Sequence, residues 1–155
     1  MPWAILGIVV ALAAAGLVAR RAKYYGRLFS DAHFREVYDG FVPALGPGRA
    51  FVTSAGLALA VTTTEVDDRR VLHVSLSQTS GYTTSAAAGR FGFFLVAILN
   101  RNKMSLDPFF TDSRVHHLVF ASPAGAPLEI NDFDSVMQHY RRGYRPLPYA
   151  LRAIE

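Results

Sequence analysis

The chain has 155 residues and a formal charge of +4, but the positive charge is unevenly placed. Residues 1–23 carry three basic and no acidic side chains, and the remainder carries 13 basic and 12 acidic side chains, a net charge of +1. The excess therefore lies beside the first apolar stretch, which favours an anionic lipid surface over nucleic acid as a partner. The absence of cysteine excludes disulfides, thiolate metal sites and a cysteine nucleophile.

Residues 3–19 carry no charged side chain, and Arg20, Arg21 and Lys23 follow them directly. As a helix, this stretch spans about 25 Å, slightly less than a bilayer core. Ala22 extends the apolar part, and the three basic side chains (the basic cluster) can snorkel to lipid headgroups. We therefore predict one continuous helix over residues 3–22 that stays in the mature chain as a single-pass membrane anchor.

Two other interpretations of this stretch stay open. A cleaved signal peptide has basic residues before its apolar core and a small-residue cleavage site after it. Here the charges follow the core, and the Ala-x-Ala pattern at residues 11–13 lies in its middle. A buried helix of a soluble domain normally shows a polar stripe, and this stretch has none. Both alternatives are therefore weaker than an anchor.

The flanking charges also predict an orientation. Basic residues beside a membrane segment prefer the cytoplasmic side, and Arg27 adds to the basic cluster. We expect the N-terminus outside and residues 24–155 in the cytoplasm. Trp3 on one side, and Tyr24 and Tyr25 on the other, suit the two interfacial belts, although these tyrosines equally suit a folded domain.

Residues 30–78 predict a helix, a loop and a hairpin. Ser30 or Asp31 can cap a helix over residues 30–38, and the glycines and prolines of residues 40–48 predict a loop. Residues 57–64 and 71–78 alternate between apolar and polar side chains across a polar turn, which is typical of a β-hairpin.

The second half of the chain predicts a helix, two strands and a further helix. A helix is predicted over residues 85–100, and its end, residues 91–99, is apolar on every side and belongs at the centre of the domain. Strands are predicted over residues 115–121 and 126–130, followed by a helix that Asp132 or Asp134 can cap.

These elements predict an α+β domain in which a mainly antiparallel sheet packs on the central helix. The chain then divides into four parts, namely a transmembrane anchor (1–23), a membrane-proximal neck (24–48), the α+β domain (49–140) and an extended tail rich in arginine, tyrosine and proline (141–155).

Histidines and aspartates are the side chains in this sequence that are most able to bind a metal or take part in catalysis. His73, His117, Asp134 and His139 could form a metal or catalytic site if the fold brought them together. Isolated histidines on strands and helix surfaces are the commoner outcome. No catalytic, metal-binding or cofactor-binding residue is therefore assigned.

The sequence gives clearer indications of residues that contact other proteins than of catalytic or metal-binding residues. Small residues at four-residue spacing let anchor helices approach one another closely, and arginine and tyrosine are favoured at protein contacts. The predicted partner-binding residues are Gly7, Ala11 and Ala15 in the anchor and Arg141, Arg142, Tyr144, Arg145 and Tyr149 in the tail.

The sequence therefore favours a non-catalytic accessory or assembly subunit of a membrane complex, in contact with lipid through the basic cluster and with other subunits. The alternative is a membrane-tethered enzyme, or a ligand- or metal-binding domain, that uses the histidines and aspartates. A third possibility is an exported domain released from a cleaved signal.

Overall fold

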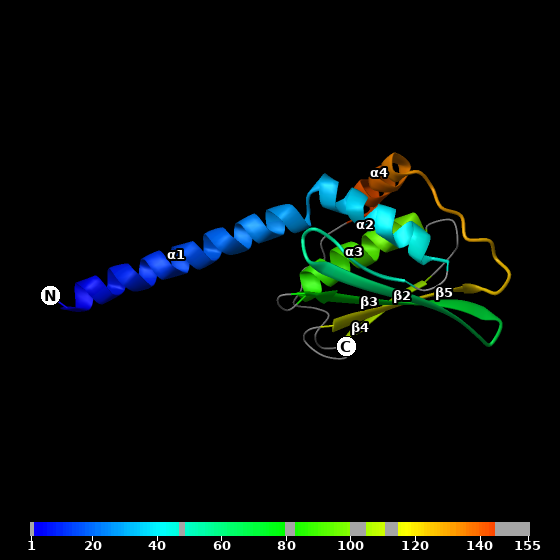
Figure 1. The fold of residues 1–155 in the computed structure, drawn as a ribbon, viewed down its shortest axis with the longest axis horizontal. Coiled ribbons are helices and arrows are strands. Elements are labelled where there is room, and N and C mark those ends of the chain that lie inside the picture. Colours follow the sequence, from blue (N-terminus) through cyan, green and yellow to red (C-terminus); the bar gives the residue numbers. More distant parts are fainter. Residues whose placement is uncertain (1, 47–48, 80–82, 100–104, 111–114, 145–155) are drawn as a thin grey trace.

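The computed structural model describes residues 2–46, 49–79, 83–99, 105–110 and 115–144, and it shows an α+β fold (Figure 1). Helices α2, α3 and α4 cover one face of a five-stranded antiparallel sheet, and α1 projects from the domain (Figure 1). The elements are α1 (Pro2–Leu28), α2 (Asp31–Ala44), β1 (Ala50–Val52), β2 (Leu57–Val66), β3 (Arg69–Gln78), α3 (Ser85–Ile98), β4 (Ser105–Phe110), β5 (Val115–Pro123) and α4 (Phe133–Gly143).

Helix α1 is longer than the predicted residues 3–22 and continues to Leu28. Residues such as Arg20, Arg21 and Lys23 favour helix, so nothing in the basic cluster ends it. The end comes where Leu28 is fully buried in the domain and Ser30 starts the next helix by accepting a hydrogen bond from the His33 N–H.

The sheet has the strand order β1-β2-β3-β5-β4, with every neighbouring pair antiparallel. The predicted hairpin is confirmed, since β2 and β3 pair from Leu57 opposite Gln78 to Val66 opposite Arg69. Asp67 and Asp68 form its two-residue turn with φ values of 48° and 57°. Two successive positive φ angles match the twist of the flanking strands and fix the register.

The core lies between the sheet and its helices. Alternate residues of β2, β3 and β5 point toward α3, and Phe94 in the middle of that helix is fully buried. The prediction that the end of this helix is central is confirmed, with Phe93 half-buried rather than enclosed. The buried residues at this contact between α3 and the central strands are Leu72, Val74, Leu76, Phe94, Leu95, Ile98, Leu99, Leu118 and Phe120.

Two strand assignments differ from the sequence prediction. Residues 126–130 form no strand, and their chain crosses the end of the hairpin, where the Arg70 side chain donates to the Ala126 carbonyl at 2.9 Å. Pro127 lacks the N–H that a strand there would need. Conversely, β4 forms around Pro108, where no strand was predicted, because proline is tolerated in an edge strand.

Helix α2 also runs further than predicted and takes in Gly40 and Pro43, which the sequence placed in a loop. Phe34, Val37 and Phe41 bury its inner face in the core. A Cβ atom at Gly40 would lie 2.5 Å from the Phe51 ring, so glycine lets β1 approach the helix. Much of the segment assigned to a membrane-proximal neck is therefore part of the helical layer.

Candidate functional site

Helix α1 exposes its apolar side chains along most of its length. Trp3 is 82% exposed, Leu12 68% and Val18 68%. The segment Ile5–Leu28 is long and apolar enough to cross a membrane, and a signal sequence would meet the same criterion. The predicted contact residues Gly7, Ala11 and Ala15 lie on this exposed helix, and so does the basic cluster.

A ladder of aromatic rings joins α1 to the domain. The Tyr24 and Tyr25 rings meet edge to face at 5.5 Å, and Tyr25 stacks on Phe29 at 5.8 Å. The Tyr25 hydroxyl also donates to Thr84 Oγ1 at 3.4 Å, at the start of α3. The two tyrosines therefore pack against the domain at the end of α1, in agreement with the alternative that they are domain residues.

His33, which is buried, also connects the end of α1 to the domain. Its Nδ1 lies 2.7 Å from the Leu28 carbonyl, and its Nε2 lies 2.6 Å from Thr53 Oγ1. A carbonyl only accepts, so Nδ1 carries the proton and Nε2 accepts from the Thr53 hydroxyl. Burial lowers the pKa of His33, against smaller opposing effects of the Leu28 carbonyl and Glu36. The neutral ring thus ties the end of α1 to the loop before β2.

His33 was not among the site residues predicted from the sequence. A signal was present, because His33, Val37 and Phe41 recur at four-residue spacing and so share one face of α2. A histidine on an apolar helix face needs partners for both ring nitrogens. Neither partner, a carbonyl at Leu28 nor a hydroxyl at Thr53, is recognisable from the local sequence.

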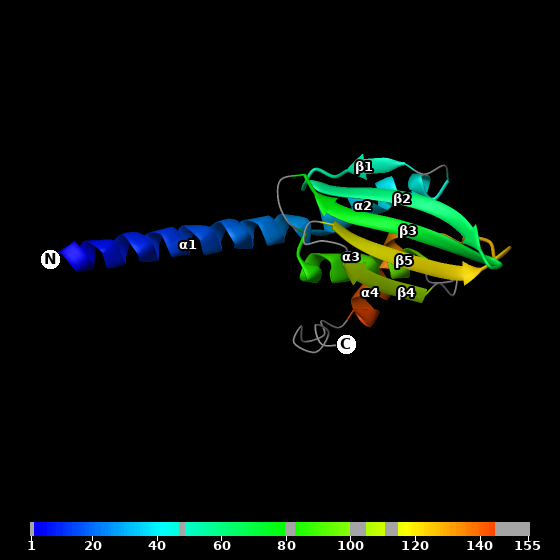
Figure 2. The same ribbon diagram turned by 90° about the horizontal axis from the view of Figure 1, so that it is seen from below.

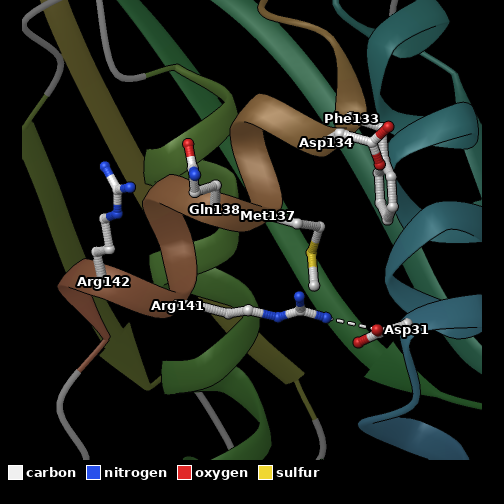
Figure 3. Close-up of a pocket in the computed structure, with 7 residues that line it drawn as sticks. All are labelled: Asp31, Phe133, Asp134, Met137, Gln138, Arg141 and Arg142. Atoms are coloured by element: carbon white, nitrogen blue, oxygen red, sulfur yellow. Dashed lines mark hydrogen bonds and ion pairs between the residues drawn. The ribbon is translucent and has the colours of Figure 1, made fainter.

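A groove of about 450 Å³ lies between α2 and α4 (Figure 3). Arg141 reaches across it and pairs with Asp31 at 2.5 Å, whereas Arg142 points away from that pair (Figure 3). The residues that line the groove are Asp31, Phe133, Asp134, Met137, Gln138, Arg141 and Arg142.

Charges and rings alternate along this groove. Arg35 lies over the Phe133 ring, 4.2 Å from its centroid, and is 3.8 Å from Asp134. Both ion pairs at the groove, from Arg35 and from Arg141, are largely solvent-exposed. The surface is therefore polar at its rim, with a floor of Met137 and Phe133, which suits contact with another chain more than enclosure of a small molecule.

Tyr144 is turned toward its own domain. Its ring stacks on Tyr140 at 5.2 Å and meets the edge of Phe93 at 5.8 Å, and its hydroxyl accepts from Arg90 Nε at 3.2 Å. Burial, helped by Tyr144, raises the pKa of Tyr140 to about 12. Of the predicted tail contacts, Arg141 and Arg142 lie at the groove, and Arg145 and Tyr149 lie outside the described residues.

The predicted histidine and aspartate site is not assembled. His73 and His117 lie on the sheet face that the helices leave open, where His117 Nδ1 is 3.1 Å from Ser75 Oγ. Asp134 and His139 belong to α4, in the helical layer on the opposite face (Figure 2). In the part of the chain that the structure describes, no three histidines, aspartates or glutamates group so as to hold a metal ion.

Comparison with known protein families, with curated proteins and with solved structures finds no match to this chain.

Proposed function

We propose that the protein is a non-catalytic accessory or assembly subunit of a membrane complex, anchored by α1 and docked on its partner through the domain. The exposure of α1 carries this proposal, since no part of its most apolar 18-residue stretch is buried against the domain. Full burial of one large aliphatic side chain is worth about 1.5–3 kcal/mol. A helix with this many exposed apolar residues therefore needs an apolar surrounding, which a bilayer supplies.

The charge distribution supports a cytoplasmic domain. Arg20, Arg21 and Lys23 lie on the domain side of the apolar stretch, and no basic side chain lies on the other side. The short connection from Leu28 to Ser30 leaves little chain between α1 and α2. The domain would therefore sit directly on the headgroup layer that the basic cluster contacts.

The groove between α2 and α4 is the part of the domain that best suits a partner subunit. It offers an apolar floor, a rim of paired charges and one arginine, Arg142, that points away from the Arg141–Asp31 pair (Figure 3). Arginine and aromatic residues are enriched at the centres of protein interfaces. Arg145 and Tyr149 remain predicted contacts of the same partner.

Co-purification of the full chain in mild detergent tests the docking. The variant carries Gln138→Ala with Arg142→Ala, and the matched control carries Glu65→Ala with Arg69→Ala at the far end of the hairpin. Loss of a stoichiometric partner from the groove variant alone is the expected result. Equal retention by both variants, with unchanged circular dichroism, would contradict docking at the groove.

A further inference from the structure

Arg90 occupies an unusual position between the end of α1 and the end of α4. Its guanidinium carbon lies 4.2 Å from the centroid of the Phe29 ring and 5.4 Å from that of Tyr144. Its Nε donates to the Tyr144 hydroxyl at 3.2 Å. Two rings and one hydrogen bond therefore hold this guanidinium in a fixed orientation, which reduces the entropy lost when it binds an anion.

The terminal nitrogens of Arg90 have no protein acceptor among the described residues. A guanidinium has five N–H groups, and among the residues that the structure describes only the one on Nε finds an acceptor. Arg35 and Arg141 differ, because Asp134 and Asp31 stand beside them. Arg90 is half-buried against rings that offer its terminal N–H groups no strong acceptor. A partly desolvated cation of this kind is normally paired with an anion.

Basic residues lie close in sequence to both residues whose rings hold Arg90. Arg27 precedes Phe29 by two residues, and Arg142 precedes Tyr144 by two residues. Asp31 also lies two residues from Phe29, but Arg141 already pairs with it. None of these described neighbours supplies the missing acceptor, which leaves the terminal nitrogens of Arg90 open to a ligand. Phosphate fits the planar, forked donors of arginine, which bind two oxygens at once.

We propose that Arg90 binds a phosphate group, carried by an anionic lipid headgroup or by a soluble phosphate compound. The lipid source rests on the proposed function, with α1 as anchor. If residues 3–22 cover the hydrocarbon core, Phe29 lies seven residues further along, about 10 Å above the core edge. The headgroup layer is about 5–8 Å thick, so Phe29, and Arg90 beside it, lie about 2–5 Å beyond its outer edge, a gap comparable to the length of one hydrogen bond.

The test uses the full chain in maltoside micelles and measures lipid adducts by native mass spectrometry. The probes are phosphatidylglycerol and diacylglycerol, which lacks the phosphate. One phosphatidylglycerol should bind in preference to diacylglycerol. Binding should weaken roughly tenfold or more in Arg90→Gln, since a charge-assisted hydrogen bond contributes that much. The matched control Arg69→Gln, at the far end of the hairpin, should bind as the wild type does.

Inorganic phosphate separates the two sources. If phosphatidylglycerol binds no better than diacylglycerol, but phosphate raises the melting temperature of the wild type and not of Arg90→Gln, the ligand is a soluble phosphate. Absence of both effects, or equal effects in wild type and Arg90→Gln, overturns the proposal.

A folding defect is handled by a second variant. If Arg90→Gln does not fold, Arg90→Lys decides, because lysine keeps the charge but not the fork. A folded lysine variant that binds as tightly as the wild type overturns the proposal. Binding in micelles does not depend on anchoring, so failure of the proposed membrane function would leave these outcomes distinct.

Discussion

His33 shows how one side chain connects an exposed apolar helix to a domain. Both of its ring nitrogens are used, by the Leu28 carbonyl and the Thr53 hydroxyl, and its edge meets the Phe91 ring at 5.4 Å. Thr53 Oγ1 in turn accepts from the Leu57 N–H at 3.2 Å. This chain of bonds runs from the last residue of α1 to the first residue of β2.

The buried ring predicts acid sensitivity. Because the pKa of His33 in the folded state is below its ordinary value of 6.5, the unfolded chain binds the proton more readily. Stability should therefore be complete above pH 6.5 and fall as the pH decreases below it. Glu36 and Asp132 also have lowered pKa values, but their ordinary values of 4.5 and 3.8 place their effect at lower pH.

Denaturant unfolding of the full chain in micelles at pH 7.5 and 5.5 measures this effect. His33→Asn should lose about 1–3 kcal/mol at pH 7.5, because a buried hydrogen-bond partner is left unsatisfied. It should also lose most of the difference between the two pH values. An equal pH difference in wild type and His33→Asn would rule out His33 as its source.

A substitution at Phe94 tests the packing of the core by the same measurement. It is fully buried, and its ring lies 4.9 Å from Phe34 and 5.7 Å from Tyr140. Phe94→Ala should reduce the free energy of unfolding by about 3–5 kcal/mol. The half-buried Phe93 is the matched control, and Phe93→Ala should cost clearly less. Equal losses would mean that α3 does not pack as the structure shows.

Among the elements, the hairpin turn is a place where a substitution should increase the stability of the fold. Asp67 and Asp68 both have positive φ, a conformation that costs most residues other than glycine about 1–2 kcal/mol. Asp68→Gly should therefore raise the free energy of unfolding by about 0.5–1 kcal/mol, and Asp68→Val should lower it. Denaturant unfolding of both variants is the check, and a loss of stability in Asp68→Gly would argue against this turn.

Elements with a strong periodic pattern were predictable from the sequence, and short or irregular ones were not. The alternation of β2 and β3 and the capped helices α3 and α4 were readable, because their patterns are local. Strand β1 has three residues, too few to show a period. Helix α2 continues through Gly40 because Phe51 packs against that glycine, a tertiary contact that overrides helix propensity.

The candidate sites depended even more on distant contacts. Composition alone located Arg141 and Arg142, but the partner of Arg141 is Asp31, 110 residues earlier in the chain. In the sequence, Arg90 only interrupts an apolar run. The two rings that contact its guanidinium, those of Phe29 and Tyr144, come from opposite ends of the domain sequence. Tertiary packing, which no local pattern records, brings these groups together.

At the scale of the whole molecule, the architecture separates two surfaces. Helix α1 extends away from the domain, and its axis runs roughly along the strands (Figures 1 and 2). A bilayer crossed by α1 would therefore lie at one end of the sheet rather than against its open face. The groove and the open sheet face would then both remain outside the bilayer.

Alkaline extraction of membranes, followed by intact mass measurement of the chain in the pellet, tests whether α1 is an uncleaved membrane anchor. If it is, the chain resists extraction and keeps residues 3–22. A chain released into the supernatant, or one whose mass shows that it begins near Ala14 or Arg20, would contradict it.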